Sequence, residues 1–353
     1  MGKDNKQWTI GMDVSDKSSC YCVLDPAGEM AAEGKIRSTE EGLRQQFSGM
    51  APAVVALEAG THSRWMSEVL RELGHEVIVA NPRRLRLLTE SDRKNDVQDA
   101  RTLAEMAWAR PSLLAPIQHR GAQAQADLNL IRARELLVGA RTKLINGVRA
   151  LVKGMAGRVP KCASDQFTTH ANSHMPEAVR PAAAPLMEAI DELSERIAML
   201  DQTIEHIAQT RYSDTELLTQ VMGVGTLSAL AFVLTIGDAQ RFGRSREVGC
   251  WLGLRPKQKD SGERTPQLGI TKAGDQYLRK IMVSCAHYIL GPFGPDTDLR
   301  RWGLKLCERG GKNAKKKAIV AVARKLAVLL HRLWVTAEVY EPLRQAKSSP
   351  AAA

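Results

Sequence analysis

The 353-residue chain lacks the sequence features of several common protein classes. Its six cysteines show no Cys-x-x-Cys pair, so we expect no zinc module and interpret them as reduced thiols, mostly in the core. The first seven residues are polar, without the apolar segment of a signal peptide, which argues against secretion. The longest apolar segment, residues 318–339, is interrupted by Arg324, Lys325, His331 and Arg332 and predicts an amphipathic helix, not a membrane span. These absences predict a cytoplasmic protein with no membrane partner.

Positive charge is concentrated in the last part of the chain. Residues 211–353 hold 24 Lys and Arg against 12 Asp and Glu, whereas residues 1–110 hold 15 against 17. This uneven distribution of the net charge of +11 is typical of a polyanion-binding domain joined to a different one. The hydrophobic content of 44% is ordinary for a folded chain and excludes a disordered protein.

A single carboxylate interrupts the first expected strand, residues 8–15. Asp13 stands among apolar side chains there, and a buried carboxylate is costly unless an ion pair or a metal compensates it. Taken alone, Asp13 is equally well explained as a turn cap. A second carboxylate, Glu58, follows the apolar run at residues 53–57 and therefore also ends a strand. The two acids need a common explanation.

The order of the expected elements over residues 1–110 is that of the ribonuclease H-like fold, in which the first and fourth strands lie side by side. We therefore expect an α/β ribonuclease H-like (RuvC-like) domain there, with Asp13 and Glu58 facing each other at the centre of its sheet. In chain order we expect strands at 8–15, 19–24 and 29–36, a helix at 38–48, a strand at 53–57, a helix at 63–73 and a strand at 76–80.

A helical pattern from residue 94 onward carries two more carboxylates, Asp96 and Asp99, three residues apart on one face. Like charges so placed repel each other. Either both are exposed beside basic neighbours, or they join Asp13 and Glu58 at one site.

Two long helical patterns follow, at residues 121–155 and 186–210, one basic and one acidic. The first carries an apolar stripe and the second has leucines and isoleucines spaced as a coiled-coil seam. Their opposite charges predict that they form an antiparallel hairpin. We expect a helical coiled-coil or linker region over 111–212 that acts as a spacer, with subunit contact as a second use. The remainder divides into a mostly α domain over 213–345 and a disordered tail over 346–353.

The C-terminal domain begins with a helix, a tight Gly-x-Gly turn at Gly223 and Gly225, and a second helix. Such a turn leaves backbone amides free for a phosphate, as in helix-hairpin-helix modules, although a buried turn between helices has the same pattern. The loop at 254–264 then carries Ser261 among four cations. No histidine lies near it in the sequence, so a hydrolase triad is not supported. A serine before a glycine is ordinary turn chemistry, but cations around a hydroxyl also suit attack on a phosphodiester.

We predict a nucleic-acid contact surface from these motifs together with the basic cluster at residues 310–317. Its predicted members are Gly223, Gly225, Arg255, Lys257, Lys259, Arg264, Lys272, Arg279, Lys312, Lys315, Lys316 and Lys317.

Taken in order and spacing, the motifs resemble those of the DEDD-type insertion-sequence transposases, a family related to the pilin-gene invertase and associated with bridge-RNA-guided recombination by a serine nucleophile. The similarity covers about residues 8–110 and 215–290. The matching segments are GMDVS at 11–15, LEAG at 57–60, DVQDA at 96–100, MGVG at 222–225, LGLRP at 252–256, DSG at 260–262 and ITKAGDQYLR at 270–279.

This resemblance implies a metal site and a nucleophile. Asp13, Glu58, Asp96 and Asp99 would bind a divalent cation, Mg²⁺ or Mn²⁺, and Ser261 would attack DNA and form a transient phosphoserine link. The implied partners are donor and target DNA, a noncoding bridge RNA and further copies of the chain in a dimer or tetramer. The resemblance assigns no role to the nearby acids Asp16 and Asp92, and Asn95 stands where the family has a threonine.

Three other functions remain open. A RuvC-like, structure-specific nuclease would use the same carboxylates with water as the nucleophile. A phosphotransferase of the actin and sugar-kinase type also has Gly-x-Asp in its first strand, but it gives no reason for the basic C-terminal region. In a non-catalytic nucleic-acid adaptor, the carboxylates would be structural.

Overall fold

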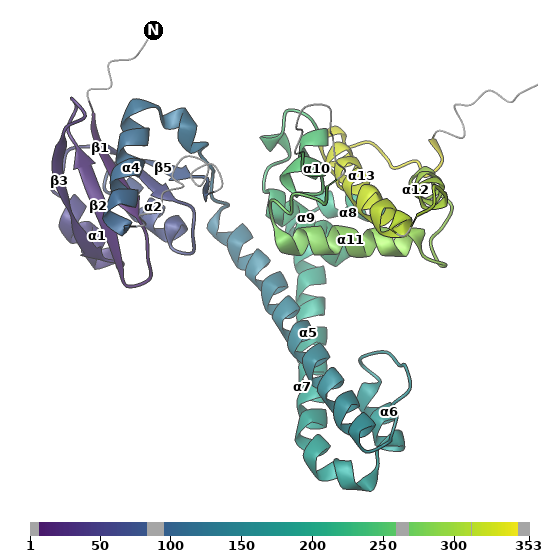
Figure 1. Ribbon diagram of the computed structural model, residues 1–353. Helices are drawn as coiled ribbons and strands as arrows, with labels where there is room; N and C mark the ends of the chain where they lie inside the picture. Colours follow the sequence, from purple (N-terminus) through teal and green to yellow (C-terminus); the bar gives the residue numbers. More distant parts are fainter. Residues whose placement is uncertain (1–6, 83–94, 259–267, 312, 345–353) are drawn as a thin grey trace, which may run out of the picture. The chain divides into compact units, whose positions relative to one another are not determined.

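The computed structural model of the chain describes residues 7–82, 95–258, 268–311 and 313–344 (Figure 1). The chain divides into two units at His119 and Arg120, and each is described by itself. No helix in the described part of the chain is long and apolar enough to cross a membrane.

The first unit contains a five-stranded mixed sheet, consistent with the ribonuclease H-like fold predicted from the sequence. The strand order is β3-β2-β1-β4-β5, with β1 antiparallel to β2 and parallel to β4. The predicted adjacency of the first and fourth strands is therefore confirmed. The elements are β1 (Trp8–Asp13), β2 (Ser18–Leu24), β3 (Met30–Arg37), α1 (Glu40–Phe47), β4 (Ala53–Glu58), α2 (Ser63–Glu72), β5 (Glu76–Ala80), α4 (Asp96–Ala109) and the short 3-10 helix η1 (Pro111–Leu114).

The two faces of the sheet are covered by different helices (Figure 1). Ile10 and Met12 of β1 pack in one core cluster with side chains of α1 and α2. Because side chains alternate along a strand, Gly11 points to the other face, where α4 lies. A Cβ atom on Gly11 would lie 2.1 Å from the carbonyl oxygen of Ala100 and 2.3 Å from the amide nitrogen of Ala104. Only a glycine lets α4 approach β1 this closely.

The first unit extends beyond the boundary expected at residue 110. After η1 the chain returns along β5: Asn81 N–H donates to the Leu114 carbonyl at 2.9 Å, and Ile117 N–H donates to the Val79 carbonyl at 2.9 Å. Leu114 is fully buried in the cluster that joins α4 to β4 and β5. These contacts assign residues 111–119 to the sheet and not to the hairpin that follows.

The second unit begins with the predicted antiparallel helical hairpin, formed by α5 (Ala122–Gly154) and α7 (Arg180–Arg211). Near its base, Arg134 Nη2 donates to Asp201 Oδ2 at 3.0 Å. Between the two arms lie α6 (Phe167–His174) and η2 (Glu177–Val179), which the sequence reading did not predict. Phe167 is buried with Met175 and Val179 in one core cluster with hairpin residues, so a few apolar side chains anchor a segment without apolar periodicity.

The remainder of the second unit is helical, as expected. The buried α9 runs through its core, and the apolar residues of α9, α11 and α13 belong to one cluster. The helix at 298–308 was not predicted. The elements are α8 (Asp214–Thr219), α9 (Thr226–Ile236), η3 (Ala239–Arg241), α10 (Arg246–Trp251), α11 (Gln276–Leu290), α12 (Asp298–Glu308) and α13 (Ala314–Thr336). The expected tail at 346–353 lies outside the described residues.

We expect Gly11→Ala to destabilise the first unit by at least about 2 kcal/mol, because its methyl group would overlap the α4 backbone. Urea unfolding followed by circular dichroism measures the change. Gly49→Ala is the matched control, since a Cβ there meets no atom within 4 Å. Equal stability of the two variants would contradict the close packing of α4 on β1.

A buried histidine predicts a pH dependence of the second unit. His331 is 1% exposed; its Nε2–H donates to the Ala239 carbonyl at 2.9 Å, and Nδ1 lies 3.0 Å from the Ser245 hydroxyl. Burial lowers the pKa of His331 below its ordinary value of 6.5, despite the opposing effect of the Ala239 hydrogen bond.

The unfolded chain therefore binds a proton at His331 before the folded chain does. We expect this contribution to stability to be complete above about pH 6.5 and to fall as the pH drops below it, by at most about 1.4 kcal/mol per pH unit. Urea unfolding between pH 5 and pH 8 measures the slope, and His331→Gln should flatten it. An unchanged slope in that variant would assign the pH dependence to other groups.

Candidate active site

Two carboxylates end neighbouring strands at the centre of the sheet. Met12 pairs with Leu57 in the parallel β1–β4 ladder, so the next residues, Asp13 and Glu58, stand side by side. Asp13 is two residues beyond Gly11 and so lies on the face that α4 covers. Glu58 shares that face, because Ala56 packs in the cluster that contains α4 residues. Both acids are partly buried.

The first turn of α4 brings Asp96 to the same end of the sheet. Ala100 contacts Gly11, and Asp96 lies one helical turn before it. The position of Asp96 relative to Asp13 is also reflected at the buried Cys20, which pairs with Asp13 across β1 and β2. Its thiol pKa is raised by burial and further by the charges of Asp96 and Asp13, against an opposite effect of Lys35. Asp96 and Asp13 are thus both within electrostatic reach of one thiol.

Asp99 lies on the β4 side of the same turn. Leu103, one turn later, packs with Ala56 of β4 and Ile78 of β5, so Asp99 projects toward the strand that ends in Glu58. The positive end of the α4 dipole offsets the repulsion between Asp96 and Asp99. The four predicted carboxylates therefore share one face and one end of the sheet. We call them the acidic cluster.

The side chains of the acidic cluster are spread apart and partly exposed to solvent. Within the described ranges, no group of three or more His, Cys, Asp or Glu side chains is close enough to hold a metal ion. Asp96 is exposed and Asp99 is partly exposed, so their side chains are accessible to a ligand. Asp92, the nearby acid to which the resemblance assigns no role, lies outside the described residues.

Asn95 fixes the start of α4. It has extended backbone geometry, and its side-chain oxygen accepts a hydrogen bond from Val97 N–H at 3.1 Å. This is the function of a helix N-cap, which asparagine and threonine both perform. The departure from the family's threonine at this position therefore has a structural explanation.

The sequence analysis named Asp16 without a role and missed His62, Ser63 and His119, which lie beside the acidic cluster. Asp16 lies 2.9 Å from His62, and the Ser63 hydroxyl lies 3.1 Å from Nε2 of His119. The only available signal was position: Asp16 closely follows Asp13, and His62 closely follows Glu58.

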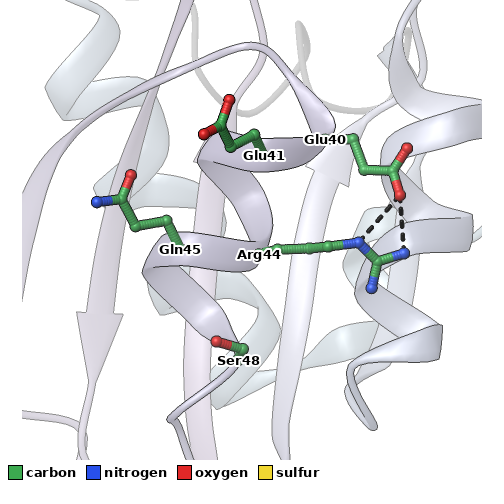
Figure 2. A pocket seen from close by; sticks show the side chains of 5 residues that line it. All are labelled: Glu40, Glu41, Arg44, Gln45 and Ser48. Atoms are coloured by element: carbon green, nitrogen blue, oxygen red, sulfur yellow. Dashed lines mark hydrogen bonds and ion pairs between the residues drawn. The ribbon is translucent and has the colours of Figure 1, made fainter.

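A shallow surface hollow on α1 is unrelated to the acidic cluster. Figure 2 shows its five lining side chains, with Arg44 paired to Glu40 at 2.8 Å. Because α1 packs on the face of the sheet opposite α4, we assign this hollow no part in the site.

In the second unit, the base of the serine loop is tightly built. A Cβ on Gly253 would lie 2.0 Å from Ala273 N, and one on Gly274 would lie 2.1 Å from the Trp251 carbonyl oxygen. Both glycines have positive φ, +71° and +72°. Lys257 N–H then pairs with the Gly269 carbonyl at 2.9 Å. Ser261, the predicted nucleophile, lies beyond this base with Lys259 and Arg264, outside the described residues.

Arg279 has a structural use at this base. Its Nη1 donates to the carbonyls of Leu252 at 3.0 Å and Ala273 at 2.6 Å, so it joins the two sides of the loop. Sequence reasoning gave Arg279 only a nucleic-acid contact, which stays a prediction. Lys272 has a left-handed φ of 54°, which is uncommon for a residue with a side chain, and its side chain is exposed.

The other described cations of the predicted contact surface are exposed. They are Arg255, Lys257, Lys315, Lys316 and Lys317, whereas Lys312 lies outside the described residues. The two helices and the intervening turn of the predicted helix-hairpin-helix-like element are present as α8, a turn and α9. Gly223 has φ +92° and packs against Tyr288 of α11, while Gly225 precedes the first turn of α9 with no atom near its Cβ position. The turn therefore combines a packed glycine with an open one.

Comparison with known proteins identifies the class to which this architecture belongs. A family model described as "Transposase" matches residues 10–156, which include the whole acidic cluster, and one described as "Transposase IS116/IS110/IS902 family" matches residues 215–297. Both matched segments are thus those of transposases.

Its relatives fix the family. A probable family 20 transposase of Pseudomonas aeruginosa is 30% identical over 94% of this chain and 98% of its own length. The transposase of insertion sequence IS1111A from Coxiella burnetii is 26% identical over 94% and 90%, and that of IS1328 from Yersinia enterocolitica is 29% identical over 78% and 82%. The chain belongs to the IS116/IS110/IS902 family of transposases, which confirms the predicted resemblance to insertion-sequence transposases. These matches do not support the serine mechanism or the bridge RNA, which stay predictions.

We expect Asn95→Ala to remove the N-cap of α4 and to destabilise the first unit by about 1 kcal/mol. Asn95→Thr should retain most of the stability, because its hydroxyl can accept the same Val97 hydrogen bond. Hydrogen exchange of the amides at 97–99 measures fraying at the turn that carries Asp96 and Asp99. Similar exchange in the two variants would show that the cap does not hold this turn.

Proposed function

We propose that this transposase cuts and rejoins DNA strands at a ribonuclease H-like (RuvC-like) site formed by Asp13, Glu58, Asp96 and Asp99, with Ser261 as the nucleophile. The observation that carries the proposal is the position of the acidic cluster. Asp13 and Glu58 end adjacent parallel strands, and the first turn of α4 lies on the same face.

The acidic cluster has the donor chemistry of a site for Mg²⁺ or Mn²⁺. Carboxylate oxygens are the ligands these cations prefer, and four carboxylates at one end of a sheet repel each other unless cations compensate them. Exposure of Asp96 and partial exposure of Asp99 leave these side chains free to change rotamer toward a cation. A bound cation would neutralise charge that develops on the phosphate.

Ser261 gives the reaction its proposed character. Attack of its Oγ on phosphorus forms a phosphoserine ester and releases a deoxyribose hydroxyl, and the hydroxyl proton of Ser261 leaves to solvent or a nearby base. A deoxyribose hydroxyl of the partner strand then attacks the ester and regenerates Ser261. Because the ester conserves the energy of the phosphodiester, strands are rejoined and not hydrolysed.

The proposed partners follow from charge and family. Exposed cations at the base of the serine loop and at the start of α13 fit the phosphates of donor and target DNA. Guidance by a noncoding bridge RNA, assembly into a dimer or tetramer, and action in the cytoplasm are part of the proposal through the family resemblance. The second unit's positive charge supports binding of either nucleic acid.

A nuclease that uses the same carboxylates and activates water is the alternative. It requires the acidic cluster but gives Ser261 no chemical task.

We expect Ser261→Ala to abolish strand exchange and the covalent protein–DNA adduct, while DNA binding is retained. The assay incubates purified protein, the transcript flanking its gene, Mg²⁺ and end-labelled DNA, and detects the adduct by denaturing gel electrophoresis. Asp13→Asn should also abolish the adduct, because it removes an acid of the cluster.

Ser228→Ala is the matched control for loss of a hydroxyl in the second unit, and it should retain activity. Continued strand cleavage by Ser261→Ala without an adduct would support the nuclease. Full activity of Asp13→Asn would overturn the proposed site itself.

A further inference from the structure

A chain of hydrogen bonds joins the two segments that follow the acidic strands. His62 Nε2 lies 2.9 Å from Asp16 Oδ1, and Trp65 Nε1–H donates to His62 Nδ1 at 3.1 Å. Asp16 is three residues beyond Asp13, which ends β1, and His62 is four residues beyond Glu58, which ends β4. The chain therefore links the end of one acidic strand to the end of the other.

The Trp65 contact determines where His62 carries its proton. An indole N–H only donates, so Nδ1 of His62 is the unprotonated acceptor, and the ring proton is on Nε2, directed at the Asp16 carboxylate. Both ring nitrogens are thus engaged, and neither has a free lone pair. A general base must present one, so this pair does not act as an Asp–His base.

The segment that Asp16 belongs to is fixed on its other side as well. The Ser38 hydroxyl donates to the Ser15 carbonyl at 2.6 Å, and the hydroxyls of the buried Ser19 and Ser38 lie 2.8 Å apart. The turn after Asp13 is therefore held by the end of β3 on one side and by His62 on the other.

The segment that contains His62 is also held by hydrogen bonds, between Gly60 and Ser63. Gly60 N–H donates to the Ser63 hydroxyl at 3.0 Å, and this hydroxyl lies 2.8 Å from the Gly60 carbonyl oxygen. The His62 side chain is 27% exposed, whereas that of Asp16 is 91% exposed. The ring is thus the fixed member of the pair, and Asp16 docks on it.

We propose that His62 is a positioning residue, which holds Asp16 and thereby ties together the segments that follow Asp13 and Glu58, so that the two carboxylates, already side by side on β1 and β4, are kept in place for divalent-cation binding. Trp65 supports this function by selecting the Nε2–H tautomer of His62. The proposal rests on the proposed metal site, and it assigns a function to Asp16 that does not require contact with the cation.

The test measures Mn²⁺ binding to the full-length protein by isothermal titration calorimetry. We expect His62→Ala to weaken binding by up to roughly 10-fold, because loss of a group bonded directly to a metal ligand costs about 10- to 100-fold and His62 acts only through Asp16. His206→Ala, an exposed histidine of α7, is the control and should bind as the wild type does.

A matched pair at Asp16 separates position from charge. Asp16→Asn loses the charge but keeps an oxygen that accepts from His62, so it should retain most of the affinity, whereas Asp16→Ala should weaken binding as His62→Ala does. Because Asp16 is almost fully exposed, neither variant disturbs the core. Equal weakening by Asn and Ala would show that only charge matters and would overturn the positioning proposal.

Nitrogen NMR of the His62 imidazole provides a readout independent of the metal. The wild type should show the Nε2–H tautomer in metal-free protein, and Trp65→Phe should shift the ring toward a mixture of tautomers. A wild-type ring protonated at Nδ1 would contradict the proposed hydrogen-bond chain.

The two proposals fail in different ways. If the wild type and Asp13→Asn bind Mn²⁺ equally, or neither binds it, the metal site is wrong. If Asp13→Asn loses binding while His62→Ala and Asp16→Ala keep wild-type affinity, the metal site stands and only the positioning function is wrong.

Discussion

The backbone contact between α4 and β1 at Gly11 is the constraint on which the acidic cluster depends. A side chain at this position would overlap Ala100 and Ala104, so the glycine sets how near the helix lies to the sheet. Helical spacing then places Asp96 one turn before the contact, at the end of the sheet where Asp13 and Glu58 stand. The position of Asp96 and Asp99 near the ends of β1 and β4 thus depends on the absence of a side chain at Gly11.

The two units differ in charge and in architecture. Acids are grouped at the end of a sheet in the first unit, where a rigid frame of strands holds them, whereas the second unit carries most of the positive charge. The serine loop begins from a base in which two glycines of positive φ and the Arg279 guanidinium hold the chain crossing tightly. This base flanks residues 259–267, which include the proposed nucleophile Ser261.

Hydrogen bonds around the acidic cluster are as much a part of the site as the acids. Asn95 caps the helix that carries Asp96 and Asp99, and the Asp16–His62–Trp65 chain joins the segments beyond Asp13 and Glu58. Carboxylates that repel one another stay near the same place only if the backbone beneath them is fixed. Asn95 and the Asp16–His62–Trp65 chain, which lie outside the strands, restrain that backbone.

The sequence by itself determined the strands, most of the helices, the adjacency of β1 and β4 and the basic character of the second unit, because apolar periodicity, turn residues and charge are local properties. It also singled out four acids as a predicted site, Asp13 and Glu58 by their place at strand ends and Asp96 and Asp99 by their spacing on one helix face. Only the tertiary structure decided that residues 111–119 return along β5, that Phe167 anchors α6, and that Arg279, Asn95 and His62 serve as supports. These features arise from contacts between residues far apart in the chain, which no local pattern records.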